Sequence, residues 1–168
     1  MIFRVVLLIF GFTCASISKE LCNIAKNPQH KYYCYNANEK DELYSRGKPA
    51  RSSAARTLIC VMAGPPQGIY SGGAYVINVT LDSDHPINAP KIYIMTPIFH
   101  PGINEDGSMC LQDLEWKASM NIIHVLDFVY DYIGNLSGQL NTQALSLISS
   151  NPEEFSVRAY RTNCIYAL

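Results

Sequence analysis

The chain has 168 residues, 48% of them hydrophobic and 16% charged, and a formal net charge of −1 at pH 7. This length suits one compact domain with a sizeable hydrophobic core. Nucleic acid is bound through concentrated positive charge, so a chain this close to neutral is not expected to have a nucleic-acid partner.

The first residues are typical of a secretory signal peptide. Arg4 supplies the basic start, residues 5–12 form an apolar run, and small residues follow at 14–16. The run is shorter than the roughly twenty apolar residues that span a bilayer, so we expect no stable transmembrane span. Residues 1–16 are predicted to be a signal peptide or another N-terminal targeting segment, with a buried first helix as the alternative. Residues 17–168 are predicted to form the core domain.

After this segment we expect one helix and four strands. Ile17, Leu21 and Ile24 recur at helical spacing, and Pro28 ends that helix. Four short apolar segments bounded by Gly, Pro and polar residues predict an antiparallel meander, with strands at 31–35, 56–63, 74–81 and 91–95. The polar stretch between the first two strands, residues 36–55, is expected to be a long loop.

Past residue 120 the apolar pattern changes to the period of a helix. Asp127 and Asp131 are expected to face away from its buried side, which is predicted to consist of Ile122, Leu126, Val129, Tyr130 and Ile133. Further helices are expected over 142–149 and 152–167. The predicted fold class is α+β, with an N-terminal helix, a four-stranded antiparallel meander sheet, an irregular segment and then C-terminal helices.

The six cysteines show no spacing typical of a zinc site, and we expect no metal site. A domain of this length does not require disulfides to fold. Four cysteines are therefore interpreted as small buried hydrophobic residues, namely Cys22, Cys34, Cys60 and Cys164. Cys110 differs from them because it lies in the irregular segment 96–121, and irregular segments held by a rigid scaffold often carry the chemistry.

Six motifs in this order resemble the ubiquitin-conjugating (E2) enzymes and their UBC fold. They are ISKELCNIAKNP (17–28), MAGPPQGIYSGGAYVINV (62–79), HPINAPKIYIMTPIFHP (85–101), GSMCL (107–111), Trp116 and the Leu140–Asn141 step. In this family an activating enzyme (E1) uses ATP to make a thioester of ubiquitin or of a ubiquitin-like protein. The E2 cysteine takes the modifier from that thioester and passes it to a lysine amine or to a ligase (E3). Cys110 matches that cysteine, and the resemblance implies no cofactor on the E2 chain itself, because the activating enzyme uses the ATP.

The resemblance also assigns positions around Cys110. Those that match the active-site loop and its support are His100, Pro101, Gly102, Asn104 and Ser108. Those that match loops contacting partner enzymes are Ile87, Lys117 and Ala118.

Gly102 departs from the family pattern, which usually has Asn after His-Pro. In the family that amide steadies the oxyanion formed when lysine attacks, or holds the loop that does so, and Gly frees the backbone instead. Removing one oxyanion donor typically costs about 2.7–4 kcal/mol. Asn104 or a backbone N–H could partly substitute for the missing amide.

A second departure is Ser137–Gly138, where many members have an acidic residue that helps position or deprotonate the lysine.

The residues around Cys110 favour thioester exchange over proteolysis. Glu105, Asp106 and Asp113 lie near it in the sequence, and nearby acids are expected to raise the pKa of a thiol. A cysteine protease needs the opposite, a thiolate primed by a paired His. A less acidic thiol remains a good nucleophile toward an already activated acyl group. His100, next to Pro on a turn, is expected to be structural and not a base.

Three functions remain open from the sequence. The first is an active, divergent E2 enzyme that carries a modifier on Cys110. The second is a non-catalytic E2-like module that binds a ubiquitin-like protein or a partner enzyme, and the third is an unrelated thiol enzyme.

The signal-like start predicts routing through the secretory pathway, with a cytoplasmic protein as the alternative. Parasites with a relict plastid send similar enzymes by signal peptide to the space around that organelle, which is one destination that this pattern fits.

Overall fold

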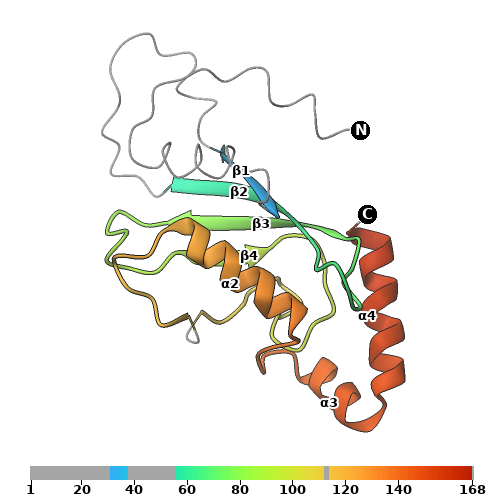
Figure 1. Ribbon diagram of the computed structural model, residues 1–168. Helices are drawn as coiled ribbons and strands as arrows, with labels where there is room; N and C mark the ends of the chain where they lie inside the picture. The colour runs from blue at the N-terminus through green and yellow to red at the C-terminus, as the bar shows by residue number, and fades with distance from the viewer. Residues whose placement is uncertain (1–30, 38–55, 112–113, 168) are drawn as a thin grey trace, which may run out of the picture.

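The computed structural model describes residues 31–37, 56–111 and 114–167 (Figure 1). The predicted targeting segment, the helix expected over residues 17–26 with Cys22, and most of the expected loop 36–55 lie outside the described residues.

The sheet has four antiparallel strands in the order β1-β2-β3-β4, which confirms the predicted meander. β2 (Arg56–Ala63) and β3 (Ala74–Leu81) have the predicted bounds. β1 (Tyr32–Asn36) begins and ends one residue later than predicted, and β4 (Lys91–Ile94) ends one residue earlier. Each strand alternates between a buried and a more exposed face, as the pleat requires.

Three helices follow the sheet, and with it they confirm the α+β fold class. α2 (Ile122–Gly134) lies across one face of the sheet, and α3 (Thr142–Ser150) and α4 (Pro152–Tyr166) follow at one end of the molecule (Figure 1). Each helix begins with an asparagine cap whose side chain accepts a backbone N–H, at Asn121, Asn141 and Asn151. None of the helices in the described segments is long and apolar enough to cross a membrane.

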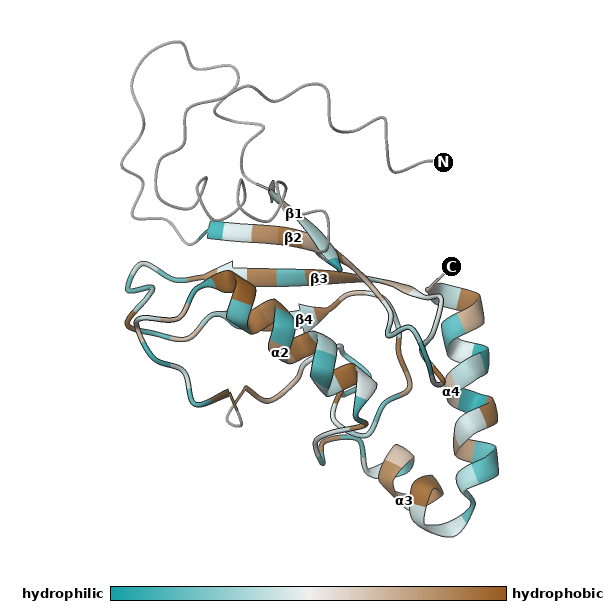
Figure 2. Ribbon diagram, in the orientation of Figure 1, coloured by the Kyte–Doolittle hydropathy of each residue, from teal (hydrophilic) through white to brown (hydrophobic). Residues whose placement is uncertain are grey.

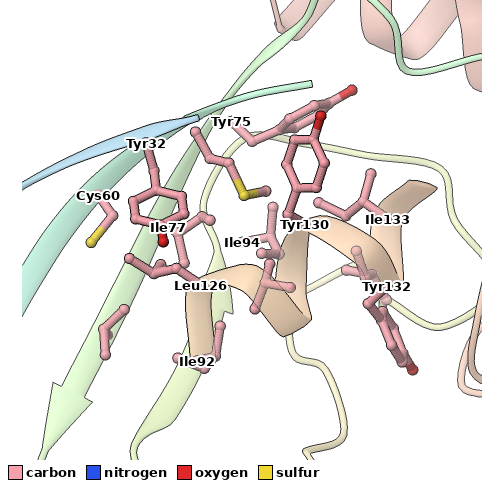
Figure 3. Close-up of a cluster of buried hydrophobic side chains, with 14 of the residues drawn as sticks. Tyr32, Cys60, Tyr75, Ile77, Ile92, Ile94, Leu126, Tyr130, Tyr132 and Ile133 are labelled. Carbon is pink, nitrogen blue, oxygen red and sulfur yellow. The ribbon is translucent and has the colours of Figure 1, made fainter. Parts of the chain in front are cut away.

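The hydrophobic core lies between the sheet and α2. Hydrophobic and hydrophilic residues alternate along this helix (Figure 2). Its buried side chains pack over inward-facing strand residues such as Ile77, Ile92 and Ile94 (Figure 3). All five residues predicted for the buried side are buried, and Asp127 and Asp131 are exposed, as expected.

The buried side of α2 extends beyond the five predicted residues and includes Tyr132. Tyr132 is only 3% exposed, and Figure 3 shows its ring pointing away from Tyr130 and away from the strands. On this side the helix is covered by the segment that contains His100 and Gly102. α2 therefore joins the core to the irregular segment that holds Cys110.

The interpretation of Cys34 and Cys60 as unpaired hydrophobic residues was wrong. Both are buried, but they stand opposite each other in the β1–β2 register and form a disulfide. The antiparallel pairing brings their Cα atoms to 4.0 Å, close enough for the bond. Cys164 on α4 has a free thiol, but it is half-buried and not fully buried as predicted.

The disulfide is expected to stabilise the fold by closing a long loop. It joins residues 26 positions apart, and a loop of that length corresponds to about 3–4 kcal/mol of lost unfolded-chain entropy. A reductant should lower the free energy of unfolding of the wild-type chain by this order, measured by urea denaturation. A Cys34→Ala/Cys60→Ala variant should be insensitive to reductant, and equal stability of the oxidised and reduced wild type would contradict the assignment.

Candidate active site

His100 is a fully buried imidazole at the start of a turn before Cys110. Its Nδ1 accepts a hydrogen bond from the Gly102 N–H at 3.0 Å, and its ring packs near those of Tyr70 and Tyr132, with centroids 5.5 and 5.8 Å away. Burial lowers the pKa of His100 to about 4, although the backbone of Ile133 and Tyr132 opposes this shift. The ring is therefore neutral at pH 7 and enclosed, which suits a structural role better than that of a base.

The same turn is tied to the beginning of α3. The Pro101 carbonyl accepts hydrogen bonds from the N–H groups of Leu140 at 2.9 Å and Asn141 at 2.8 Å. The Asn141 side chain caps α3 by accepting the Ala144 N–H, and it donates to the Ile103 carbonyl at 3.5 Å. These hydrogen bonds therefore join the His-Pro step (100–101) to the Leu-Asn step (140–141), although the two are about forty residues apart in the sequence.

Asn104 and Ser108 belong to a second, tighter turn. The Asn104 N–H donates to the Ser108 carbonyl at 2.9 Å, and the Asn104 amide donates to the Ser108 hydroxyl at 2.8 Å. Gly107 has a positive φ of 82°, and its carbonyl accepts the Ile94 N–H at 2.8 Å, which attaches the turn to β4. The Asn104 amide is engaged within this turn, so the geometry does not support it as a substitute for the motif Asn.

Cys110 follows these two turns directly. Met109 forms an antiparallel bridge with Ile103, and Ser108 forms one with Tyr93 of β4. Cys110 is half-buried with a free thiol. In the described part of the chain the other free thiol belongs to Cys164 on α4. The backbone pairing of its neighbours thus holds Cys110 at a defined place on the surface.

Position 102 requires glycine because a side chain would have no room there, and not because the backbone adopts a positive φ. A Cβ on Gly102 would collide with the Tyr132 hydroxyl and with the Ser137 carbonyl oxygen. The Tyr132 hydroxyl donates to the Gly102 carbonyl at 3.3 Å. Tyr132 was not among the predicted site residues, because the predicted buried side of α2 was limited to five other residues.

The positions expected to contact partner enzymes lie in two connected loops. Ile87 is 77% exposed, and Lys117 and Ala118 are exposed. The Trp116 Nε1 donates to the Pro86 carbonyl at 2.9 Å, which joins the loop before β4 to the loop after Cys110. Asp113 and its neighbour at 112 lie outside the described residues.

The described segments contain no group of three or more His, Cys, Asp or Glu side chains placed to hold a metal ion.

A model of the ubiquitin-conjugating enzyme family matches residues 16–162, which include the four strands, α2, α3, the two turns before Cys110 and most of α4. The chain belongs to this family. Its fold is the UBC fold. A crystal structure of a Plasmodium yoelii protein assigned to the ubiquitin-conjugating enzymes has a TM-score of 0.74 and 23% identity, covering 93% of this chain and 98% of that one. The E2 domain of a Toxoplasma gondii ubiquitin-conjugating enzyme has a TM-score of 0.71 and 21% identity, covering 89% and 95%.

Curated relatives include enzymes for two different modifiers. Ubiquitin-conjugating enzyme E2 S-B of Xenopus laevis is 35% identical over 108 residues, covering 62% of this chain and 51% of the relative. NEDD8-conjugating enzyme ubc-12 of Caenorhabditis elegans is 29% identical over 131 residues, covering 71% and 72%. The chain thus spans about half the length of the E2 S relatives that it matches.

The buried imidazole predicts a pH dependence of stability. The folded chain keeps His100 neutral down to a pKa of about 4, whereas an unfolded His takes up its proton near pH 6.5. The stabilisation is therefore complete above pH 6.5 and is lost as the pH falls toward 4, by about 3 kcal/mol in total. In His100→Asn, whose amide oxygen can still accept the Gly102 N–H, this loss should be absent. Urea denaturation of both proteins from pH 7 to 4 tests it, and parallel profiles would contradict it.

Proposed function

We propose that this chain accepts ubiquitin or a ubiquitin-like protein as a thioester on Cys110 and transfers it to a lysine amine or to a ligase. The observation that carries the proposal is the placement of a free, half-exposed thiol directly after the two hydrogen-bonded turns of the irregular segment. Membership in the ubiquitin-conjugating enzyme family supports it.

The first step is an exchange between two thioesters. The Cys110 sulfur, as thiolate, attacks the carbonyl carbon at the modifier's C-terminus, and a new C–S bond forms while the bond to the activating-enzyme cysteine breaks. The departing cysteine takes the electron pair and leaves as a thiolate, so no net charge is created. This exchange needs correct placement of the sulfur more than it needs a strong base, which suits a site whose His100 is neutral and buried.

In the second step an amine attacks the thioester on Cys110. A C–N bond forms, the nitrogen loses a proton to water, and the Cys110 sulfur leaves with the electron pair of the broken C–S bond as a thiolate. The tetrahedral intermediate carries an oxyanion, which donors at the site stabilise. Since position 102 has no side-chain donor here, we expect this step to be slower than in relatives with Asn.

The chain is proposed to need no cofactor of its own, because the activating enzyme uses the ATP. Its partners are proposed to be a ubiquitin-like protein, an activating enzyme and a ligase. The exposed side chains of Ile87, Lys117 and Ala118, on loops joined by the Trp116 hydrogen bond, offer the surface for the partner enzymes.

A non-catalytic binding module is the second candidate. The observations that favour it are Gly102 and Gly138, which leave the site without the amide and without the acid of the family pattern. A module of this kind would bind a modifier or a partner enzyme without forming a covalent bond.

A thioester assay separates these two functions. The full chain is incubated with Mg-ATP and either ubiquitin or NEDD8, each with its activating enzyme, and run on a non-reducing gel. We expect one modifier to give a band one modifier heavier that disappears when thiol is added. Cys110→Ala should lose the band. Cys164→Ala is the matched control because it removes the other described free thiol, and it should keep the band.

If neither modifier produces a band while a known E2 enzyme is charged in the same reaction, the catalytic proposal fails. Binding of either modifier to the uncharged chain, measured by calorimetry, would then support the module. A band that persists in Cys110→Ala and disappears in Cys164→Ala would place the thioester on Cys164 and contradict the proposal.

We further propose that the chain is routed through the secretory pathway, with a plastid-associated compartment as one destination. The Cys34–Cys60 disulfide supports this, since disulfides persist mainly in oxidising compartments. Full-length protein with a C-terminal tag should resist protease in intact microsomes and lack residues 1–16 by mass spectrometry. A protease-sensitive protein with Met1 intact in the cytosol would contradict the routing.

A further inference from the structure

Two glycines face each other across a narrow slot beside the active-site turn. Gly102 lies in the turn and Gly138 in the connection between α2 and α3, and a Cβ on Gly138 would lie 2.7 Å from the Gly102 Cα. Gly138 also has a positive φ of 90°. Both glycines stand at positions where the family pattern has a functional side chain, the amide at 102 and the acid near 138.

The phenol of Tyr132 fills this slot. A Cβ on either glycine would collide with the Tyr132 hydroxyl. The ring stacks on His100 with an interplanar angle of 30° and packs against Phe128 with centroids 5.4 Å apart. The side chain is 3% exposed, so its volume and its hydroxyl belong to the site and not to the surface.

The hydroxyl makes a polar contact that holds the turn. It donates to the Gly102 carbonyl at 3.3 Å, while the Gly102 N–H is held by His100. Both polar groups of the Gly102 backbone are thus bonded, and the next residue, Ile103, pairs with Met109, which precedes Cys110. A short series of contacts therefore connects the Tyr132 hydroxyl to Cys110: the hydroxyl bonds to Gly102, and Ile103 pairs with Met109.

We propose that Tyr132 is a positioning residue that replaces the motif asparagine. Its phenol takes the space of the missing side chain and its hydroxyl fixes the turn that orients the thioester for attack by an amine. This inference rests on the proposed thioester function. It assigns to α2 a role at the site in addition to its role in the core, and it explains why Gly102 and Gly138 occur together.

Tyr132→Phe tests the hydroxyl with the ring kept in place. Charging of Cys110 should stay within about twofold of wild type, because exchange places smaller demands on the turn. Discharge to free lysine in a single turnover should fall by about threefold to tenfold, the range expected for one lost hydrogen bond. Discharge to hydroxylamine, which attacks thioesters without help from the protein, should be unchanged, so a merely less stable protein would not give this pattern. Tyr130→Phe, which removes a phenol oxygen from the other side of α2, should behave as wild type.

A swap tests the shared space. Gly102→Asn should lower the melting temperature strongly in the wild-type background, and it should lower it less in a Tyr132→Ala background. The Ser137 carbonyl is the same in both backgrounds, so the comparison isolates the phenol. The double variant should also discharge to lysine faster than Tyr132→Ala alone, since it regains an amide at position 102.

The outcomes separate this inference from the function on which it rests. If the wild-type chain does not charge, both proposals fall. If it charges but Tyr132→Phe discharges to lysine at the wild-type rate, only the role of Tyr132 falls. If Gly102→Asn lowers the melting temperature by the same amount with and without Tyr132→Ala, the shared slot is wrong.

Discussion

The hydrogen bond from the Gly102 N–H to the buried Nδ1 of His100 is the contact on which the rest of the site depends. Because the imidazole is enclosed and neutral, one of its nitrogens remains available as an acceptor and fixes the turn. The turn then offers its Pro101 carbonyl to the start of α3 and pairs through Ile103 with the segment that ends at Cys110. The proposed nucleophile is therefore placed by buried backbone contacts and not by a partner that activates it.

This arrangement fits the energetics of the proposed reaction. The acyl group would arrive already activated as a thioester. The main task of the site is therefore to position the Cys110 sulfur against the thioester carbonyl, and strong activation of the nucleophile is not needed. α2 serves both the core and the site. One side packs on the sheet, and the other presents Tyr132 to the slot between the two glycines (Figure 3). A change inside the helix can therefore alter the site without touching the substrate.

The sequence predicted the sheet and the buried side of α2 well, because alternation, helical spacing and Gly-Pro boundaries are local signals. β2 and β3 have the predicted bounds. The Cys34–Cys60 disulfide was missed because it depends on strand register across 26 residues. Gly102 was noticed as a departure, but its cause lies thirty residues away in Tyr132, and no local pattern connects the two. Asn104 looked available as a donor until its turn placed the amide on Ser108.

Cys110→Ser shows whether residue 110 forms an acyl bond with a modifier. Replacing the sulfur by oxygen should trap the modifier as an oxyester, which resists thiols but is cleaved by alkali. The expected intact mass is that of the chain plus one modifier less one water, and peptide mass spectrometry should map the adduct to position 110. A wild-type chain whose adduct maps to Cys164 or to a lysine, with Cys110→Ser protein giving no adduct at position 110, would contradict the proposed thioester on Cys110.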